Sequence, residues 1–150
     1  MLKIERMQEK DFAEVEEISK QRFGAFSWQI ELFESELSQK DHFAFVARLD
    51  GKVVSFLVFM KTFSDVFGDE FNVLNIATKK EYENMGIATE MFAFMRNFGK
   101  QFNIKNLWLE VRESNLNAIK FYSNYGFKKD YIRKKYYADG ENAIVMSCSV

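Results

Sequence analysis

Apolar and polar positions follow two different periods along this chain, and together they predict an alternation of strands and helices. Some stretches are apolar over strand length or alternate every second residue, whereas others repeat apolar residues three and four positions apart, as a helix does. In chain order these patterns predict strand, helix, helix, three strands, helix, strand, helix and two strands. No internal repeat, linker or low-complexity tract separates them. Residues 1–150 are therefore predicted to form one domain.

The first third is predicted to hold a strand over residues 2–7 and two helices. Asp11 is expected to cap the first helix, with Glu14 completing a capping box, and Ser27 is expected at the start of the second helix. Residues 22–26 connect the two helices. This connection is either a plain turn or, like many loops at the edge of an α/β fold, part of a substrate mouth.

Two strands, residues 42–48 and 53–60, are predicted to pair as an antiparallel hairpin. Asp50 and Gly51 lie between them, and this dipeptide favours a type I′ turn, in which both central residues need a positive φ. Residues 62–70 are polar and contain a glycine, so they are predicted to form the next hairpin loop.

Residues 71–103 are predicted to form a buried strand, a polar turn and a helix. Gly86 stands where the turn becomes the helix, and a glycine there lets a ligand approach the backbone closely. The first N–H groups of a helix have no acceptor within the helix, so this junction suits an anion such as a phosphate or pyrophosphate. The apolar stripe of the helix consists of Ile87, Met91, Phe94, Met95 and Phe98.

The last third is predicted to hold a strand, a helix and a closing hairpin. The strand spans residues 107–112 and carries Glu110 within an apolar run, where burying a charge without a partner is costly. A helix is expected from a Ser114 cap to Gly126. Residues 127–137 and 143–149 then form the hairpin, around Asp139-Gly140.

Composition removes several functional classes. The net charge of −1 argues against a general nucleic-acid binder, although the second half of the chain is basic and the first half acidic. No apolar run is long enough to span a membrane, so a cytoplasmic protein is expected. Cys148 is the only cysteine and His42 the only histidine. Neither has neighbours at ligand spacing, so no metal is expected, Cys148 is predicted to be a small core residue and His42 a surface residue.

Two stretches carry a resemblance to a known family. Residues 83–88, ENMGIA, with the strand before them and the helix after them, resemble the Q/R-x-x-G-x-G/A loop of the GCN5-related N-acetyltransferases (GNATs). Glu83 stands where that family has Gln or Arg. Residues 107–127, LWLEVRESNLNAIKFYSNYGF, and the following YIRKKYY resemble the RimI-type branch, whose members acetylate an N-terminal alanine of ribosomal protein. Residues 22–33 resemble the substrate-side segment of that branch, with Ser27 in place of its proline.

This resemblance covers the whole order of elements and implies both a fold and a set of site residues. The implied fold is α/β (α+β), with a mixed, mostly antiparallel sheet of about seven strands, about four flanking helices, and strands that splay at an acetyl-CoA cleft. Glu110 is implied as the proton acceptor and Tyr122 as the proton donor, with Asn115 contacting the pantetheine arm. The implied backbone contacts to acetyl-CoA are Ile76, Ala77, Thr78, Asn84, Met85, Gly86, Ile87, Ala88 and Thr89.

The chemistry of these residue types agrees with the implied roles. An α-amine has a pKa of about 7.7 to 8.0, so near neutral pH much of it must lose a proton before it attacks a thioester. A carboxylate can accept that proton, and a phenol can protonate the leaving thiolate. Each residue also has a purely structural alternative: Glu110 in an ion pair with a nearby Arg or Lys, Tyr122 in the core, and Asn115 at the helix start.

The sequence therefore predicts an enzyme that transfers an acetyl group from acetyl-CoA to a protein or peptide N-terminus. The expected acceptor is the N-terminal alanine of a small-subunit ribosomal protein, with no direct nucleic-acid or membrane partner. Two alternatives remain. One is a GNAT that acetylates a small-molecule amine or a lysine side chain, because a fold does not determine its substrate. The other is a non-catalytic acyl-CoA-binding module, suggested by Glu83.

Overall fold

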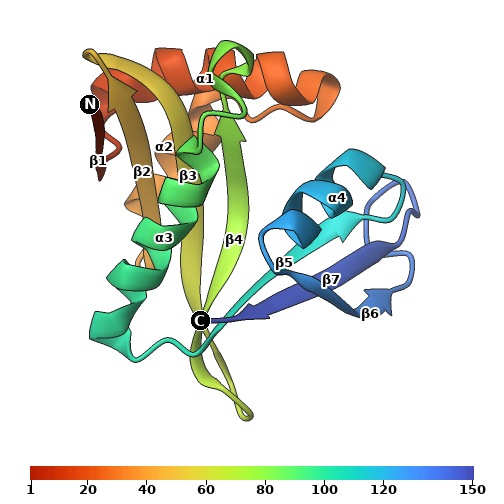
Figure 1. The fold of residues 1–150 in the computed structure, drawn as a ribbon. Coiled ribbons are helices and arrows are strands. Elements are labelled where there is room, and N and C mark those ends of the chain that lie inside the picture. The colour runs from red at the N-terminus through yellow and green to blue at the C-terminus, as the bar shows by residue number, and fades with distance from the viewer. The chain divides into compact units, whose positions relative to one another are not determined.

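The computed structural model describes residues 1–150, and its elements follow the predicted order (Figure 1). Its strands form one sheet in the order β1-β2-β3-β4-β5-β7-β6. The pairs β1–β2, β2–β3, β5–β7 and β6–β7 are antiparallel, and β4–β5 is parallel. The expected mixed, mostly antiparallel fold is confirmed. The strands are β1 (Leu2–Arg6), β2 (His42–Leu49), β3 (Lys52–Ser64), β4 (Gly68–Thr78), β5 (Asn106–Arg112), β6 (Lys128–Arg133) and β7 (Ala143–Ser149), and the helices are α1 (Phe12–Phe23), α2 (Ile30–Ser38), α3 (Ile87–Gly99) and α4 (Leu116–Asn124).

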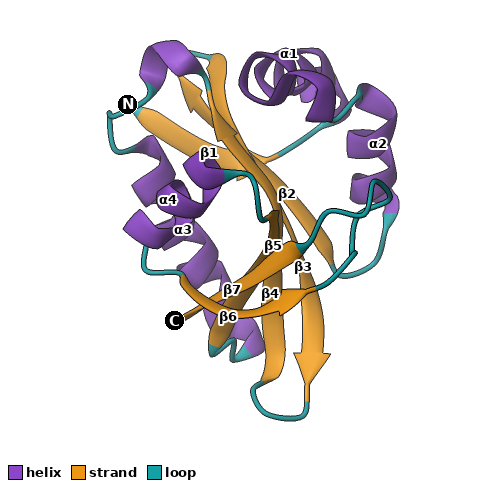
Figure 2. Ribbon diagram, turned by 90° about the vertical axis from the view of Figure 1, so that its right-hand side faces the viewer, coloured by secondary structure: helices purple, strands orange, loops and turns teal.

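The residues group into two compact units. The first comprises residues 1–61 and 73–98, and the second comprises residues 62–72 and 99–150. Figure 2 distinguishes the helices, strands and loops of both units. None of the helices is long and apolar enough to cross a membrane.

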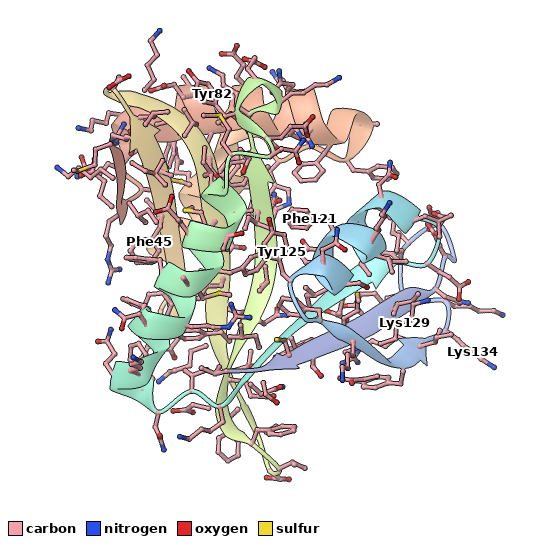
Figure 3. All side chains as sticks on the ribbon, in the orientation of Figure 1. Phe45, Tyr82, Phe121, Tyr125, Lys129 and Lys134 are labelled. Carbon is pink, nitrogen blue, oxygen red and sulfur yellow. The ribbon has the colours of Figure 1, made fainter.

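The sheet of the first unit is buried on both faces, and the alternation of side chains along β2 explains how. Ala44 and Val46 belong to the core that includes Phe12, Val15 and Ile18 of α1. Phe45 points to the other face and meets Phe94 of α3 with a distance of 4.6 Å between ring centroids (Figure 3). Because adjacent residues of a strand face opposite sides, one apolar strand packs against helices from two parts of the sequence.

The predicted β2–β3 turn is confirmed, but the next loop is shorter than predicted. Asp50 has φ 51° and Gly51 φ 80°, as a type I′ turn requires. Residues 62–70 mostly belong to strands, since β3 continues to Ser64 and β4 begins at Gly68. Their polar side chains find partners on β5. The Trp108 Nε1 donates to Thr62 Oγ1 (3.0 Å), and the Asn106 amide donates to the buried Glu70 carboxylate (2.5 Å).

The predicted caps of the first two helices are wrong. Asp11 makes no side-chain cap for α1; its carboxylate accepts instead from the Gln8 N–H (2.9 Å) and from Arg48 Nη2 (2.5 Å). Glu14, expected in the capping box, accepts from the Val53 N–H (3.1 Å). Asp11 thus bonds to a residue before the helix and to Arg48 on β2, and Glu14 bonds to the backbone of β3.

Helix α2 begins at Ile30 and not at Ser27. The reason lies on α1, where two side chains take the N–H groups of the connection. Ser19 Oγ accepts from the Trp28 N–H (2.7 Å), and Glu16 Oε2 accepts from the Ile30 N–H (2.7 Å). The chain after α1 is a short 3₁₀ turn, Gly24–Phe26, in which Phe26 is exposed.

In the second unit, β5 alternates as predicted: Leu107, Leu109 and Val111 are buried, whereas Glu110 is partly exposed. Helix α4 is capped by Asn115 and not by Ser114. Strand β6 ends at Arg133, so the predicted strand to residue 137 is too long.

Gly99, at the end of α3, has no room for a side chain. A Cβ there would lie 3.0 Å from Ile104 Cβ and 3.1 Å from Phe71 Cε2. We expect Gly99→Ala to lower the free energy of unfolding by about 1–3 kcal/mol, because overpacking outweighs the helix propensity of alanine. Urea denaturation measures this change. Asn97→Ala, at an exposed position of the same helix, is the matched control, and an unchanged or raised stability of Gly99→Ala would contradict the packing argument.

Candidate active site

The predicted acetyl-CoA loop lies in the first unit, and its backbone presents free N–H groups. Asn84 has φ 64° and Gly86 φ 79°, and these left-handed residues turn the chain into α3. The Glu90 N–H donates to the Gly86 carbonyl (3.1 Å), so the N–H groups of Ile87, Ala88 and Thr89 precede the first bond of the helix. A Cβ placed on Gly86 would meet nothing within 4 Å, so the backbone is open to a ligand. Unpaired N–H groups at the start of a helix can bind an anion such as a phosphate.

The end of β4, which precedes this loop, is held by β3. Ile76 and Ala77 are buried. The Ser55 hydroxyl donates to the Ala77 carbonyl (2.8 Å) and lies 3.1 Å from Thr78 Oγ1. These contacts hold the residues predicted to contact acetyl-CoA on β4 and join them to the loop through a short 3₁₀ turn, Lys80–Tyr82.

Glu110 and Tyr122, the predicted proton acceptor and donor, both lie in the second unit. The Glu110 side chain is 18% exposed, and its Oε2 forms an ion pair with Arg133 Nε at 3.1 Å. The structure thus contains the ion pair that was the structural alternative for Glu110. While Arg133 Nε contacts the carboxylate, its Nη2 donates to the Tyr131 hydroxyl (3.1 Å).

Two tyrosines from the β6–β7 connection adjoin Glu110. Burial and a hydrogen bond to the Glu110 carboxylate raise the pKa of Tyr136, in that order of size. Burial and the negative charge of Glu110 raise the pKa of Tyr137. Both phenols therefore keep their protons at neutral pH, and Tyr136 is the one that donates a hydrogen bond to the carboxylate.

Arg112 holds this connection in place. Its Nη1 donates to Asp139 Oδ2 (2.8 Å) and Glu141 Oε1 (2.9 Å), and its guanidinium lies 4.1 Å from the centroid of the Tyr137 ring. Glu141 Oε2 also accepts from the Ser114 N–H (2.8 Å). The connection is therefore fastened to the end of β5, the strand that carries Glu110.

Tyr122, on α4, packs among aromatic rings of the second unit. Its ring packs edge-on against Phe121 and Phe127, with centroids 5.3 Å and 5.7 Å away. Burial raises the pKa of Tyr122, with a smaller contribution from Tyr137. Tyr137 itself feels the negative charge of Glu110, so the Tyr137 phenol interacts electrostatically with both predicted catalytic residues.

Two other sequence expectations have different outcomes. Asn115 Oδ1 accepts from the Ala118 N–H (3.1 Å), so the structure contains the cap of α4 that was the structural alternative for Asn115. His42 is not a surface residue; its side chain is 10% exposed and its Nδ1 bonds to Glu36.

Sequence reasoning assigned no role to Arg133, Tyr136 or Tyr137. The available signal was the run YIRKKYY, which was part of the resemblance. Its tyrosines were expected on a strand, and only the folded connection brings them to Glu110.

The chain is similar to several known acetyltransferases. The model of the acetyltransferase (GNAT) family matches residues 5–127. The [ribosomal protein bS18]-alanine N-acetyltransferase of Escherichia coli is 32% identical over 133 residues, covering 87% of this chain and 86% of that protein. An N-alpha-acetyltransferase of Sulfurisphaera tokodaii is 33% identical over 123 residues, covering 77% and 74%. The crystal structure of the ribosomal-protein-S18-alanine N-acetyltransferase from Escherichia coli superimposes with a TM-score of 0.79 at 29% identity, over 100% of this chain and 94% of that one.

The raised pKa of Tyr122 predicts a pH dependence of stability. The folded chain keeps the phenolic proton at a pH where the unfolded chain, with a tyrosine pKa of about 10, loses it. This contribution to the free energy of unfolding is complete below about pH 10 and is lost as the pH rises further. We expect wild type to lose stability more steeply than Tyr122→Phe between about pH 9 and 11, as measured by urea denaturation. Parallel curves for the two proteins would contradict this expectation.

Proposed function

We propose that the acceptor of this chain is the α-amine at a protein N-terminus. The premise is that the chain belongs to the acetyltransferase (GNAT) family and is an acetyl-CoA-dependent N-acetyltransferase. The N-terminal alanine of a small-subunit ribosomal protein is the acceptor that we propose in particular. The main support is the Glu110 carboxylate on β5, which accepts a hydrogen bond from Tyr136, while Tyr137 lies on the same fastened connection as Tyr136. Relatives named for N-terminal acetylation support the same acceptor class.

In this proposal Glu110 takes the proton of the incoming ammonium, directly or through a water. The ion pair with Arg133 restricts the Glu110 side chain, which suits a positioned base. Tyr136 and Tyr137 supply hydrogen-bond donors and aromatic surface beside it, which suit the first peptide group of an acceptor.

Tyr122 is the proposed proton donor to the leaving thiolate. A phenol stays protonated over the range in which a thiol of pKa about 8.5 ionises, so a proton is present when the thiolate leaves. The packing of its ring against Phe121 and Phe127 fixes the direction of the hydroxyl.

The proposed acetyl-CoA contacts are the residues predicted from the sequence. The open backbone from Asn84 to Thr89 would hold phosphate, residues 76–78 would contact the thioester arm, and the Asn115 amide would donate to the pantetheine. Bound acetyl-CoA supplies an activated thioester. Backbone N–H groups near Ala77 would polarise its carbonyl.

Glu110→Gln and Tyr122→Phe test the assigned chemistry. We expect each to lower kcat by about 100-fold or more, the usual effect of losing a positioned base or acid, with little change in the Kd of acetyl-CoA. Glu113→Gln, one residue after β5, and Tyr125→Phe, one residue after α4, are matched controls. Spectrophotometric detection of the released CoA thiol measures kcat, and calorimetry measures the Kd of acetyl-CoA. Equal loss of binding and turnover, or turnover unchanged, would oppose these roles, and wild type that binds acetyl-CoA without turnover would indicate the non-catalytic module.

The acceptor class is tested with matched substrates. We expect turnover of a peptide with a free N-terminal alanine and none of the same peptide with a blocked N-terminus and an internal lysine. We compare the kcat/KM of the peptide with the free N-terminus with the kcat/KM of each small amine in a panel. Turnover of small amines or of the blocked lysine peptide, without turnover of the free N-terminus, would overturn the proposed acceptor.

A further inference from the structure

Glu83 places a negative charge at the start of the proposed phosphate-binding loop. The corresponding position of the family motif holds Gln or Arg, and a carboxylate facing a phosphate is unfavourable. The structure shows where this carboxylate goes. Glu83 Oε2 lies 3.2 Å from Arg22 Nη2, and Arg22 belongs to the last turn of α1. A cation from a helix distant in sequence therefore lies beside the residue that holds the motif's polar or basic position.

The preceding residue fastens the end of α1 to the same loop. Gln21 Nε2 donates to Glu81 Oε1 (2.8 Å), while Gln21 Oε1 accepts from the Lys80 N–H (3.0 Å). The hydrogen bond from Gln21 is also the main reason that the pKa of Glu81 is lowered. Figure 3 marks Tyr82 in the middle of this segment, next to α1. Two consecutive residues of α1 thus contact residues 80–83, so the backbone that carries Arg22 is fixed relative to the loop.

Arg22 retains hydrogen-bonding capacity beyond this pair. A guanidinium has five N–H donors, and the ion pair with Glu83 uses Nη2. The Arg22 side chain is 31% exposed, so a ligand in solution can reach it. Arginine binds phosphate strongly because its planar donors match the phosphate oxygens.

We propose that Arg22 binds a phosphate group of acetyl-CoA and that Glu83 positions Arg22 for this contact. The inference rests on the proposed use of residues 84–89 as the phosphate loop. Glu83 then turns its own charge away from the ligand and holds a guanidinium beside the loop. Arg22 of α1 and Glu83 of the loop together take the place of the motif's polar or basic side chain.

Calorimetric titration of the Arg22→Gln chain tests the proposal. We expect the Kd of acetyl-CoA to rise about tenfold or more, the worth of one hydrogen bond to a charged group. The inhibition constant of S-acetylpantetheine, which has no phosphate, should stay the same. A rise for acetyl-3′-dephospho-CoA as well assigns the contact to the pyrophosphate, and a rise confined to acetyl-CoA assigns it to the 3′-phosphate. Unchanged acetyl-CoA affinity, or equal losses for S-acetylpantetheine, would overturn the proposal.

Two further variants separate a direct contact from a general charge effect. Lys20→Gln removes one positive charge from the same turn of α1, where Lys20 pairs with Glu16 (3.4 Å), and should leave the Kd unchanged. Arg22→Glu should bind more weakly than Arg22→Gln, and adding Glu83→Arg should restore the Kd to within about threefold of wild type. A loss in Lys20→Gln equal to that in Arg22→Gln, or no recovery in the exchanged pair, would count against the proposal.

The same titrations distinguish this inference from the proposed function. Wild type that fails to bind acetyl-CoA would contradict the function itself. Wild type that binds and turns over acetyl-CoA, with Arg22→Gln equal to it, would contradict only the role of Arg22.

Discussion

The proposed cofactor site depends on one backbone constraint, which is that α3 begins with its first N–H groups unpaired and uncovered. Contacts on the two elements that flank the loop, α3 and β4, impose this constraint. Aromatic contacts such as Phe45 with Phe94 hold α3 on the sheet, and the Ser55 hydroxyl holds the end of β4 at Ala77. The connection must then turn sharply, and Gly86 adopts the positive φ that the turn needs. Apolar packing thus positions a polar site that consists of backbone N–H groups.

In the second unit, the main feature is a group of polar side chains near one carboxylate, that of Glu110. Arg112 performs this task with two acidic partners and the ring of Tyr137. Ion pairs at a partly exposed surface add little to stability, because water competes for the same charges. Their effect here is geometric, since they fasten a connection that carries two tyrosines to the strand that carries Glu110.

Each unit therefore uses a charged pair that joins segments distant in sequence. Glu83 looks unsuitable for a phosphate loop when it is considered alone, and its charge is matched once Arg22 is seen beside it. Glu110 looks like an unpaired charge in an apolar strand until Arg133 is included. In each case the local sequence identifies a position of interest, and the partner explains how the fold tolerates it.

The sequence by itself determined the order of the elements, the turn at Asp50-Gly51, and the alternation of β5, because these follow from periods and backbone preferences over a few residues. The resemblance added the fold and the loop before α3. Tertiary structure alone decided the partners of polar side chains: Asp11 binds Arg48, 37 residues away, and does not cap α1. It also decided that Tyr136 and Tyr137 adjoin Glu110. A hydrogen bond or ion pair forms with whatever group burial brings within about 3 Å, and no local pattern records that distance.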